Sequence, residues 1–87
     1  MNLSFEWDEN KARSNTKKHG VTFEESSSVF ADEVHSIEEP REIIVGHSAA
    51  GRLLVVSFTE RGEAIRIISA RQASKRERRD DERRPRN

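Results

Sequence analysis

Cysteine is absent from the 87-residue sequence, which excludes disulfide bonds, thiolate chemistry and a cysteine-based zinc site. No apolar run reaches the length of a transmembrane helix, and the opening residues MNLSFEWDENK lack the basic and apolar regions of a signal peptide. The sequence also lacks a glycine-rich phosphate loop, a nucleophile elbow and a dinucleotide-binding fingerprint. We therefore expect a cytoplasmic protein without a membrane segment.

Apolar residues are scarce: they make up 32% of the sequence, against 37% for charged residues. Such a composition leans toward partial disorder, and a chain of this length forms one domain with a limited core. The apolar residues are nevertheless concentrated in residues 3–7, 21–30 and 43–70. We therefore expect one domain over residues 1–87, in which residues 72–87 form a basic helical tail that is frayed or bound to a partner.

The charges are divided unevenly, although the net charge is zero. Residues 1–70 carry eight basic and twelve acidic side chains, whereas residues 71–87 carry eight basic and four acidic ones. A basic end on an acidic body indicates contact with a polyanion or an acidic partner surface. The alternative is a solvated, frayed helix end.

The first part of the sequence predicts a strand and two helices. Apolar and polar residues alternate over residues 3–7, which is typical of a strand with one buried face. Asp8 predicts the N-cap of a helix over residues 9–18, and Gly20 predicts its left-handed C-terminal cap. Thr22 begins a second helix with the capping-box sequence TFEE, which the following run of serines weakens.

The second part predicts three strands over residues 41–48, 52–60 and 64–70, separated by the turn sequences AAG and RGE. Close turns between neighbouring strands make an antiparallel meander. The loop before them holds at most an edge piece, because Pro40 stops any strand there. Ser74 and Glu77 form another capping-box pattern, which begins a final helix of about ten residues with no apolar face. The expected fold class is α+β.

The hairpin around RGE separates two chemically different faces. With a two-residue turn, the numbers of facing residues sum to an odd number, and this fixes which side chains share a face. One face carries Ser57, Thr59, Arg61 and Arg66. The other carries the expected core residues Val56, Phe58, Ile65 and Ile67, with Glu60 near the turn. A slip of the register by one residue would reverse this assignment.

Three arginines of this region are candidates for a phosphate site. Arg66 and Arg61 share the open face, and Arg71 lies at the strand end, where the sequence leaves its facing undetermined. Guanidinium groups are always charged and present a planar fork that suits phosphate. The alternative is an ordinary exposed sheet face whose arginines pair with Asp or Glu of a neighbouring strand.

The sequence offers little for a metal site, because His19, His35 and His47 are scattered and lack a nearby carboxylate at ligand spacing. Metal-free cleavage of RNA needs less: the 2′-hydroxyl of the RNA attacks the adjacent phosphorus, and the protein supplies a proton acceptor, a proton donor and cations. The three arginines could supply the cations, and the imidazole of His19 could move protons. Lys18 or Glu60 could substitute or assist. The alternative role for His19 is to cap the C-terminus of its helix.

The motifs together resemble the BrnT family of bacterial toxins. The shared elements are F-x-W-D-x-x-K, N-x-x-K-H-G-V-x-F-E-E, G-R-L-L-V-V, T-x-R and R-I-I-S-A-R-x-A-x-x-x-E-R, and they follow one another over residues 5–78. The resemblance implies a small endoribonuclease of the RelE/ParE-like fold that acts without a cofactor and arrests growth as the toxin of a type II toxin–antitoxin pair. It also implies a BrnA-like antitoxin partner with a ribbon-helix-helix-type DNA-binding part. The complex would repress its own operon, and DNA contact would come mainly through that partner.

The resemblance places candidate residues on its own motifs. Lys18 and His19 match K-H-G, Arg61 matches T-x-R, and Arg71 matches the second arginine of R-I-I-S-A-R; these four are the candidates for catalysis. The candidates for RNA or phosphate binding are Arg66, Thr59, Lys75 and Arg76, and no metal ligand is expected. Residues 31–40 form a shorter loop than is usual in the family, so the part of that loop in binding stays open.

A second function also agrees with the sequence. A toxin that has lost catalysis would act as an RNA-binding or protein-binding module, for example as part of a repressor. Such a module would bind RNA with an affinity that falls with salt but would show no turnover.

Overall fold

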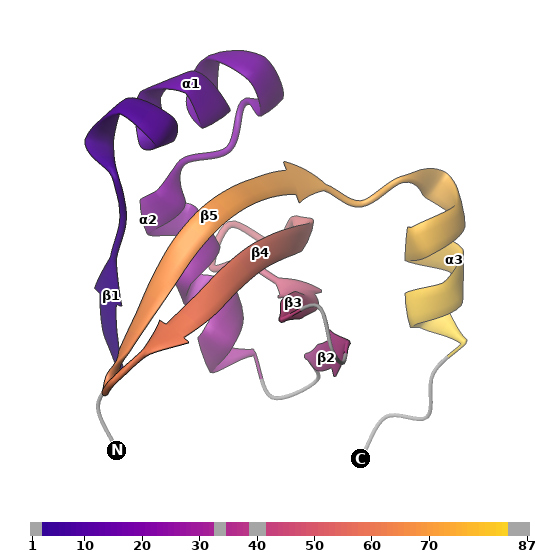
Figure 1. Ribbon diagram of the computed structural model, residues 1–87. Coiled ribbons are helices and arrows are strands. Elements are labelled where there is room, and N and C mark those ends of the chain that lie inside the picture. Colours follow the sequence, from indigo (N-terminus) through magenta and orange to yellow (C-terminus); the bar gives the residue numbers. More distant parts are fainter. Residues whose placement is uncertain (1–2, 33–34, 39–41, 84–87) are drawn as a thin grey trace.

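A five-stranded mixed sheet forms the centre of the computed structural model, which describes residues 3–32, 35–38 and 42–83 (Figure 1). The strands are β1 (Ser4–Glu6), β2 (Ser36–Glu38), β3 (Ile43–His47), β4 (Leu53–Arg61) and β5 (Ala64–Gln72). They lie in the order β1-β5-β4-β3-β2. The first strand runs parallel to β5, and all other neighbours are antiparallel.

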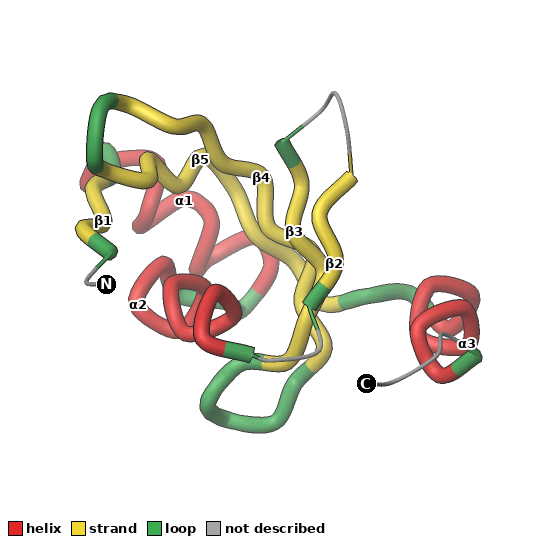
Figure 2. The backbone as a smooth tube through the Cα atoms, turned by 90° about the horizontal axis from the view of Figure 1, so that it is seen from below, coloured by secondary structure: helices red, strands yellow, loops and turns green. Residues whose placement is uncertain are grey.

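The helices are placed unevenly around this sheet. They are α1 (Glu9–His19), α2 (Phe23–Ser27), the 3-10 helix η1 (Ser28–Ala31) and α3 (Lys75–Glu82). Helices α1 and α2 cover one face of the sheet, whereas α3 stands apart, beyond the end of β5 (Figure 2). No helix among the described residues is long and apolar enough to cross a membrane.

The ends of α1 follow from local hydrogen bonds, as the sequence predicts. The Asp8 carboxylate accepts the backbone N–H groups of Asn10 at 2.8 Å and Lys11 at 3.1 Å. Gly20 closes the helix with a φ of 69°, and its N–H donates to the carbonyl of Thr16 at 2.8 Å. A residue with a Cβ would be strained in this left-handed conformation.

The second helix is short because its serines bond to their own backbone. The hydroxyl groups of Ser26, Ser27 and Ser28 each donate to a carbonyl three or four residues earlier. Such bonds compete with the regular helix, and α2 tightens into η1 after five residues. The predicted capping box forms by half: Thr22 accepts the Glu25 N–H, but the Glu25 side chain turns away to other partners.

The predicted antiparallel meander is present as β3, β4 and β5, but the sheet contains two strands in addition to this meander. Strand β2 adds an antiparallel edge beside β3, and β1 adds a parallel edge beside β5. Local patterns could not show this, because Phe5 of β1 pairs with Ile65, sixty residues further along the chain. The predicted stop at Pro40 lies outside the described residues.

The hairpin tip has the predicted register. Gly62 and Glu63 form the two-residue turn, so that Arg61 faces Ala64 and Thr59 faces Arg66. The core face is packed by α1 and α2, and the aromatic rings of Phe30 and Phe58 meet edge to face. The largest apolar side chains that are fully buried are Phe23, Ile44, Leu54, Ile67, Val21, Val29 and Val56. The opposite face carries Thr59, Arg61 and Arg66, as expected.

A β-bulge changes the register further along β5. Phe58 pairs with Ile67 but Ser57 pairs with Ser69, so Ile68 is the additional residue. The one-residue shift puts Ala70 on the core face and turns Arg71 to the opposite face, across from Val55, which is buried in a second cluster with Val45, Leu53 and Ala73. The sequence left the facing of Arg71 undetermined, and the bulge decides it.

Candidate functional site

An open groove of about 330 Å³ lies between α1 and the edge of β5, beyond the short pairing of that edge with β1. Cationic and polar side chains dominate its lining, with one apolar contribution from the bulge. The lining residues are Asn10, Lys11, Ser14, Asn15, Lys18, His19, Ile68 and Ser69. Both Lys18 and His19, which the sequence proposed for catalysis, therefore lie in the same concave site.

The spacing of the α1 residues explains why they share the groove. Residues three, four and seven positions apart lie on one face of a helix, so Lys11, Asn15 and Lys18 form a stripe toward β5. Strand β5 contributes Ser69 to the opposite wall. Because the bulge breaks the regular ladder at this point, it also sets the direction in which Ser69 is presented.

The surroundings of His19 bear on its two alternative roles. The C-terminal carbonyls of α1 are served by the Gly20 N–H, which donates to Thr16. The His19 ring makes no hydrogen bond within the described part of the chain, and the residue is exposed along the groove. Its position thus leaves the imidazole accessible to a bound molecule, although its charge would still suit the helix C-terminus.

Asn15 connects the two walls of the groove. Its buried carboxamide donates to the carbonyls of Val21 at 3.0 Å and Ala70 at 2.9 Å, and accepts the Ala70 N–H at 3.0 Å. The amide therefore satisfies the backbone of β5 where no neighbouring strand does so on that side. These bonds fix α1 against β5 at Ala70, the residue that precedes Arg71 in the sequence.

Arg71 points to the open face and is held by an acidic side chain of α3. Its Nη1 and Nη2 donate to the two carboxylate oxygens of Glu77 at 2.7 and 2.9 Å. This pair lowers the pKa of Glu77 to about 2, with help from the Ser74 N–H, and raises the pKa of Arg71. Arg71 thus stays charged, but one edge of its guanidinium is occupied.

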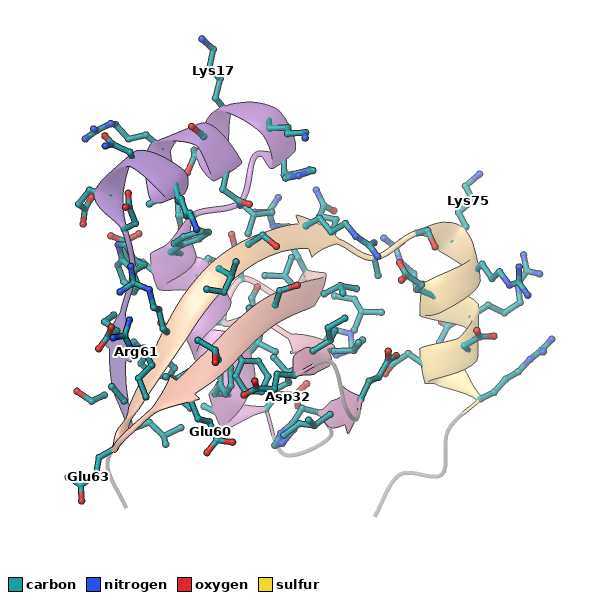
Figure 3. The ribbon with its side chains drawn as sticks, in the orientation of Figure 1. Lys17, Asp32, Glu60, Arg61, Glu63 and Lys75 are labelled. Atoms are coloured by element: carbon teal, nitrogen blue, oxygen red, sulfur yellow. The ribbon has the colours of Figure 1, made fainter. Side chains whose placement is uncertain are left out.

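The first turn of α3 brings further cations close to Arg71. Ser74 and Glu77 form the complete capping box that the sequence predicted. Lys75 and Arg76 follow directly and are exposed. Lys75 of α3 and Lys17 of α1 project to the same side of the molecule, on either side of the end of β5 (Figure 3).

The hairpin tip carries the other candidates in different surroundings. Arg66 is half-buried and pairs with Glu6 of β1 at 2.9 Å. The Thr59 hydroxyl makes a long hydrogen bond of 3.4 Å to Glu42. Arg61 is exposed near the turn and makes no hydrogen bond or ion pair to the described residues.

The structure does not bring the three arginines together. Arg66 and Arg71 are five residues apart on one strand, which corresponds to about 16 Å at the rise of an extended strand. Arg61 faces Ala64, which places it about 23 Å from Arg71 by the same measure. One phosphate cannot touch all three, so they could only contact different phosphates. Glu60, an alternative proton acceptor, also lies at the tip and away from the groove.

Metal-ligand geometry is absent from the described residues, in which no three His, Asp or Glu side chains cluster suitably. His47 and His35 both approach Asp32, but beside β3, two strands away from β5 and the groove. The carboxylate of Asp32 accepts the His47 backbone N–H at 2.6 Å, and its carbonyl lies 2.6 Å from the His35 ring. These contacts connect the end of η1 to β3.

Four residues of this region were not predicted as parts of the site: Lys11, Asn15, Ser69 and Glu77, the last of which was expected only as a capping residue. Two signals were available. Lys11 precedes Lys18 by seven residues, which is two helical turns, and Asn15 is a polar residue one turn before the K-H-G motif. For Ser69 no local signal exists, because its position depends on the bulge.

The arrangement defines a class of protein: a small α+β domain with a cation-lined groove. The groove holds lysine and histidine side chains, which can transfer protons, and Arg71 follows two residues after Ser69 of its wall. Comparison with known proteins narrows this class. Residues 7–77 match the model of the family described as the ribonuclease toxin BrnT of type II toxin–antitoxin systems, and the chain belongs to that family. The family confirms the resemblance inferred from the motifs and supports a ribonuclease with an RNA substrate and an antitoxin partner.

A solved structure has the same fold. The crystal structure of the Brucella abortus ribonuclease toxin BrnT is 24% identical in sequence and has a TM-score of 0.67, covering 85% of this chain and 100% of the other. No curated protein matches the sequence.

Proposed function

We propose that this protein is the active toxin of a type II pair and cleaves RNA internally without a metal ion. The observation that carries the proposal is the groove in which Lys11, Lys18 and His19 of α1 face Ser69 of β5. Arg71 follows two residues later on the same strand. A proton-transferring group, ammonium groups and a guanidinium are the components that metal-free RNA cleavage requires.

The proposed reaction assigns a step to each group. His19 takes the proton of the ribose 2′-hydroxyl, whose oxygen then attacks the adjacent phosphorus. Lys18 and Arg71 stabilise the charge that develops on the phosphoryl oxygens. The bond from phosphorus to the 5′-oxygen breaks, and an ammonium group or the protonated imidazole returns a proton to that oxygen. The products are a 2′,3′-cyclic phosphate and a 5′-hydroxyl.

The remaining candidates would bind the RNA on either side of this step. Lys75 and Arg76 extend from Arg71 along α3, whereas Thr59, Arg61 and Arg66 lie toward the hairpin tip. Their separation suits successive phosphates of an extended strand rather than one phosphate. Each such contact should contribute to the salt dependence of binding.

The partner belongs to the same proposal. We expect a BrnA-like antitoxin of the ribbon-helix-helix type that neutralises the toxin in the cytoplasm, forms the repressor of the operon with it and makes the main DNA contacts. The relation of the fold to RelE/ParE toxins is part of this proposal. The C-terminal segment 71–87, with eight basic and four acidic side chains, would contact the antitoxin, RNA, or both.

The experiment uses purified protein and end-labelled RNA in EDTA, with wild type beside R71A and R61A, each with and without the antitoxin. We expect cleavage by the wild type, products with 2′,3′-cyclic phosphate ends, and inhibition by the antitoxin. R71A should lower the rate about 100-fold or more, because it removes a preorganised cation beside the reacting phosphate. R61A should lower it less than about tenfold, because it removes a distant phosphate contact.

The matched control is R13A, which removes the same charge from an exposed position of α1 outside the groove. It should leave the rate unchanged. The second candidate function, a non-catalytic binding module, is favoured by the ion pairs of Arg66 and Arg71, which already satisfy part of their binding capacity. That function would be supported if a folded wild type bound RNA in a salt-dependent way but produced no fragments.

A further inference from the structure

The ion pair between Arg71 and Glu77 occupies one edge of the guanidinium group and leaves a second edge available for another ligand. The two bonds, at 2.7 and 2.9 Å, engage Nη1 and Nη2 end-on. A second edge, made of the Nε–H and the outer N–H of Nη2, has no partner among residues 3–32, 35–38 and 42–83. A guanidinium has five N–H groups, so it can hold a carboxylate on one edge and a phosphate on the other.

Glu77 itself is anchored on its far side. Its Oε1 accepts the Ser74 backbone N–H at 2.8 Å, and its own N–H donates to the Ser74 hydroxyl at 3.2 Å. The carboxylate is therefore fixed to the rigid first turn of α3, while the arginine that it holds comes from β5. About 45% of the Arg71 side chain remains exposed, so a ligand can reach the second edge.

We propose that Glu77 is a positioning residue for the reaction, which holds the Arg71 guanidinium so that its Nε–Nη2 edge takes a phosphate of the RNA. This inference rests on the proposed function of the same site. An exposed arginine on a strand samples many rotamers, and a bidentate partner restricts it to the orientation that phosphate binding needs. Glu77 touches no reacting atom and acts only through Arg71.

The opposite relation is a defined alternative outcome. A carboxylate on the guanidinium fork resembles a phosphate in geometry and charge, so Glu77 could instead compete with RNA for Arg71. The two relations predict opposite signs: positioning predicts slower turnover when the pair is broken, whereas competition predicts tighter binding and turnover that is equal or faster.

The kinetic test compares E77Q with E82Q, which removes the same charge from an exposed position on the same helix. We expect E77Q to lower kcat about tenfold with KM changed less than about twofold, and E82Q to change neither by more than about twofold. In the R71A background, E77Q should have no further effect, because the residue through which it acts is absent. An unchanged or raised kcat in E77Q overturns the proposal, as does a tenfold loss that persists in R71A.

A second variant separates positioning from helix capping. S74A removes the hydroxyl half of the capping box but leaves both oxygens of Glu77 available to Arg71. It should lower the melting temperature while kcat stays within about twofold of wild type. If S74A and E77Q lower kcat equally, Glu77 acts through the stability of α3, and the proposal is wrong.

A measurement without turnover makes the inference independent of cleavage. In an NMR titration with a 2′-O-methyl oligonucleotide, which cannot react, the Nε–H resonance of Arg71 should shift in wild type and in S74A. In E77Q the shift should be lost or reduced. If the wild type binds in this way but cleaves no RNA, the proposed catalysis fails while the positioning stands. An Nε–H resonance that does not respond in wild type overturns the positioning itself.

Discussion

The two ends of the β4–β5 hairpin carry similar side chains in different surroundings. At the tip, Arg61, Arg66 and Thr59 lie on a regular ladder, and neighbouring carboxylates of Glu6 and Glu42 partner two of them. At the other end, a bulge interrupts the ladder and two helices approach from either side (Figure 1). At that end, titratable side chains of a second element, α1, line a groove beside β5.

This difference is the reason why we place the proposed reaction at the groove and not at the arginines of the tip. Both ends carry guanidinium groups and hydroxyls. The end beside α1 also has a concave surface, the imidazole of His19 and a buried amide that fixes the distance between the walls. Concavity and fixed geometry are what convert charge into catalysis.

The largest expected effect concerns His19 at the groove end, by which we mean the end of the hairpin where Ile68 and Ser69 of β5 lie beside α1. H19Q keeps a polar side chain of similar size but removes proton transfer, and it should lower kcat by about 10²- to 10⁴-fold. The rate of RNA cleavage measures this. The control H35Q makes the same change at an exposed histidine outside the groove and should stay within about twofold. A rate for H19Q within about threefold of wild type would return His19 to the role of a helix-terminal charge.

The next effect concerns the link between the walls. N15A removes three hydrogen bonds and leaves the buried backbone groups of Ala70 unpaired, so the free energy of unfolding should fall by about 1–3 kcal/mol. Urea denaturation measures this. N10A changes an exposed asparagine on the same helix and should alter stability by less than about 0.5 kcal/mol. Equal effects of the two variants would show that the groove end is not held by Asn15.

A smaller effect appears in acid. The folded-state pKa of Glu77 is about 2, below the ordinary value of 4.5, because Arg71 and the Ser74 N–H bind the charged form. Its contribution is therefore complete above about pH 4.5 and is lost as the pH falls toward 2. Since the pair is partly exposed, we expect about 1 kcal/mol or less. E77Q should flatten the fall in stability between pH 5 and 2, measured by thermal unfolding at several pH values.

The matched change at the tip is E63Q, which removes a carboxylate from the exposed hairpin turn. It should leave the acid dependence as in wild type. If E63Q and E77Q flatten the curve equally, the Arg71–Glu77 ion pair has no special part in the acid dependence of stability.

The smallest effect belongs to the Arg66–Glu6 pair. It joins β1 to β5 at the tip, with 30% and 41% of the two side chains exposed. Exposed ion pairs contribute about 0–1 kcal/mol, so a double-mutant cycle with R66A and E6A should give a coupling energy below about 1 kcal/mol. A coupling above about 2 kcal/mol would make the tip as tightly fixed as the groove end and would remove the contrast.

The elements that the sequence predicted correctly are those set by neighbours in the chain. Asp8 caps the N-terminus of α1 and Gly20 caps its C-terminus, and the capping box of Ser74 and Glu77 begins α3. A cap can be predicted because it needs only residues within one helical turn. The two-residue turn likewise fixed the faces of the hairpin tip. Lys18 and His19, at the C-terminal end of α1, both line the groove, and their catalytic roles remain predictions.

The sequence alone thus determined helix ends, hairpin faces, family and the side chains available for chemistry. Only the tertiary structure decided the bulge at Ile68, the parallel pairing of β1, and the bonds of Asn15 to Ala70, fifty-five residues away. It also decided that Arg71 faces Glu77 while Arg61 lies far from both. The physical reason is that caps and turns are satisfied within a few residues, whereas a bulge and a buried amide are stabilised only when distant segments pack together.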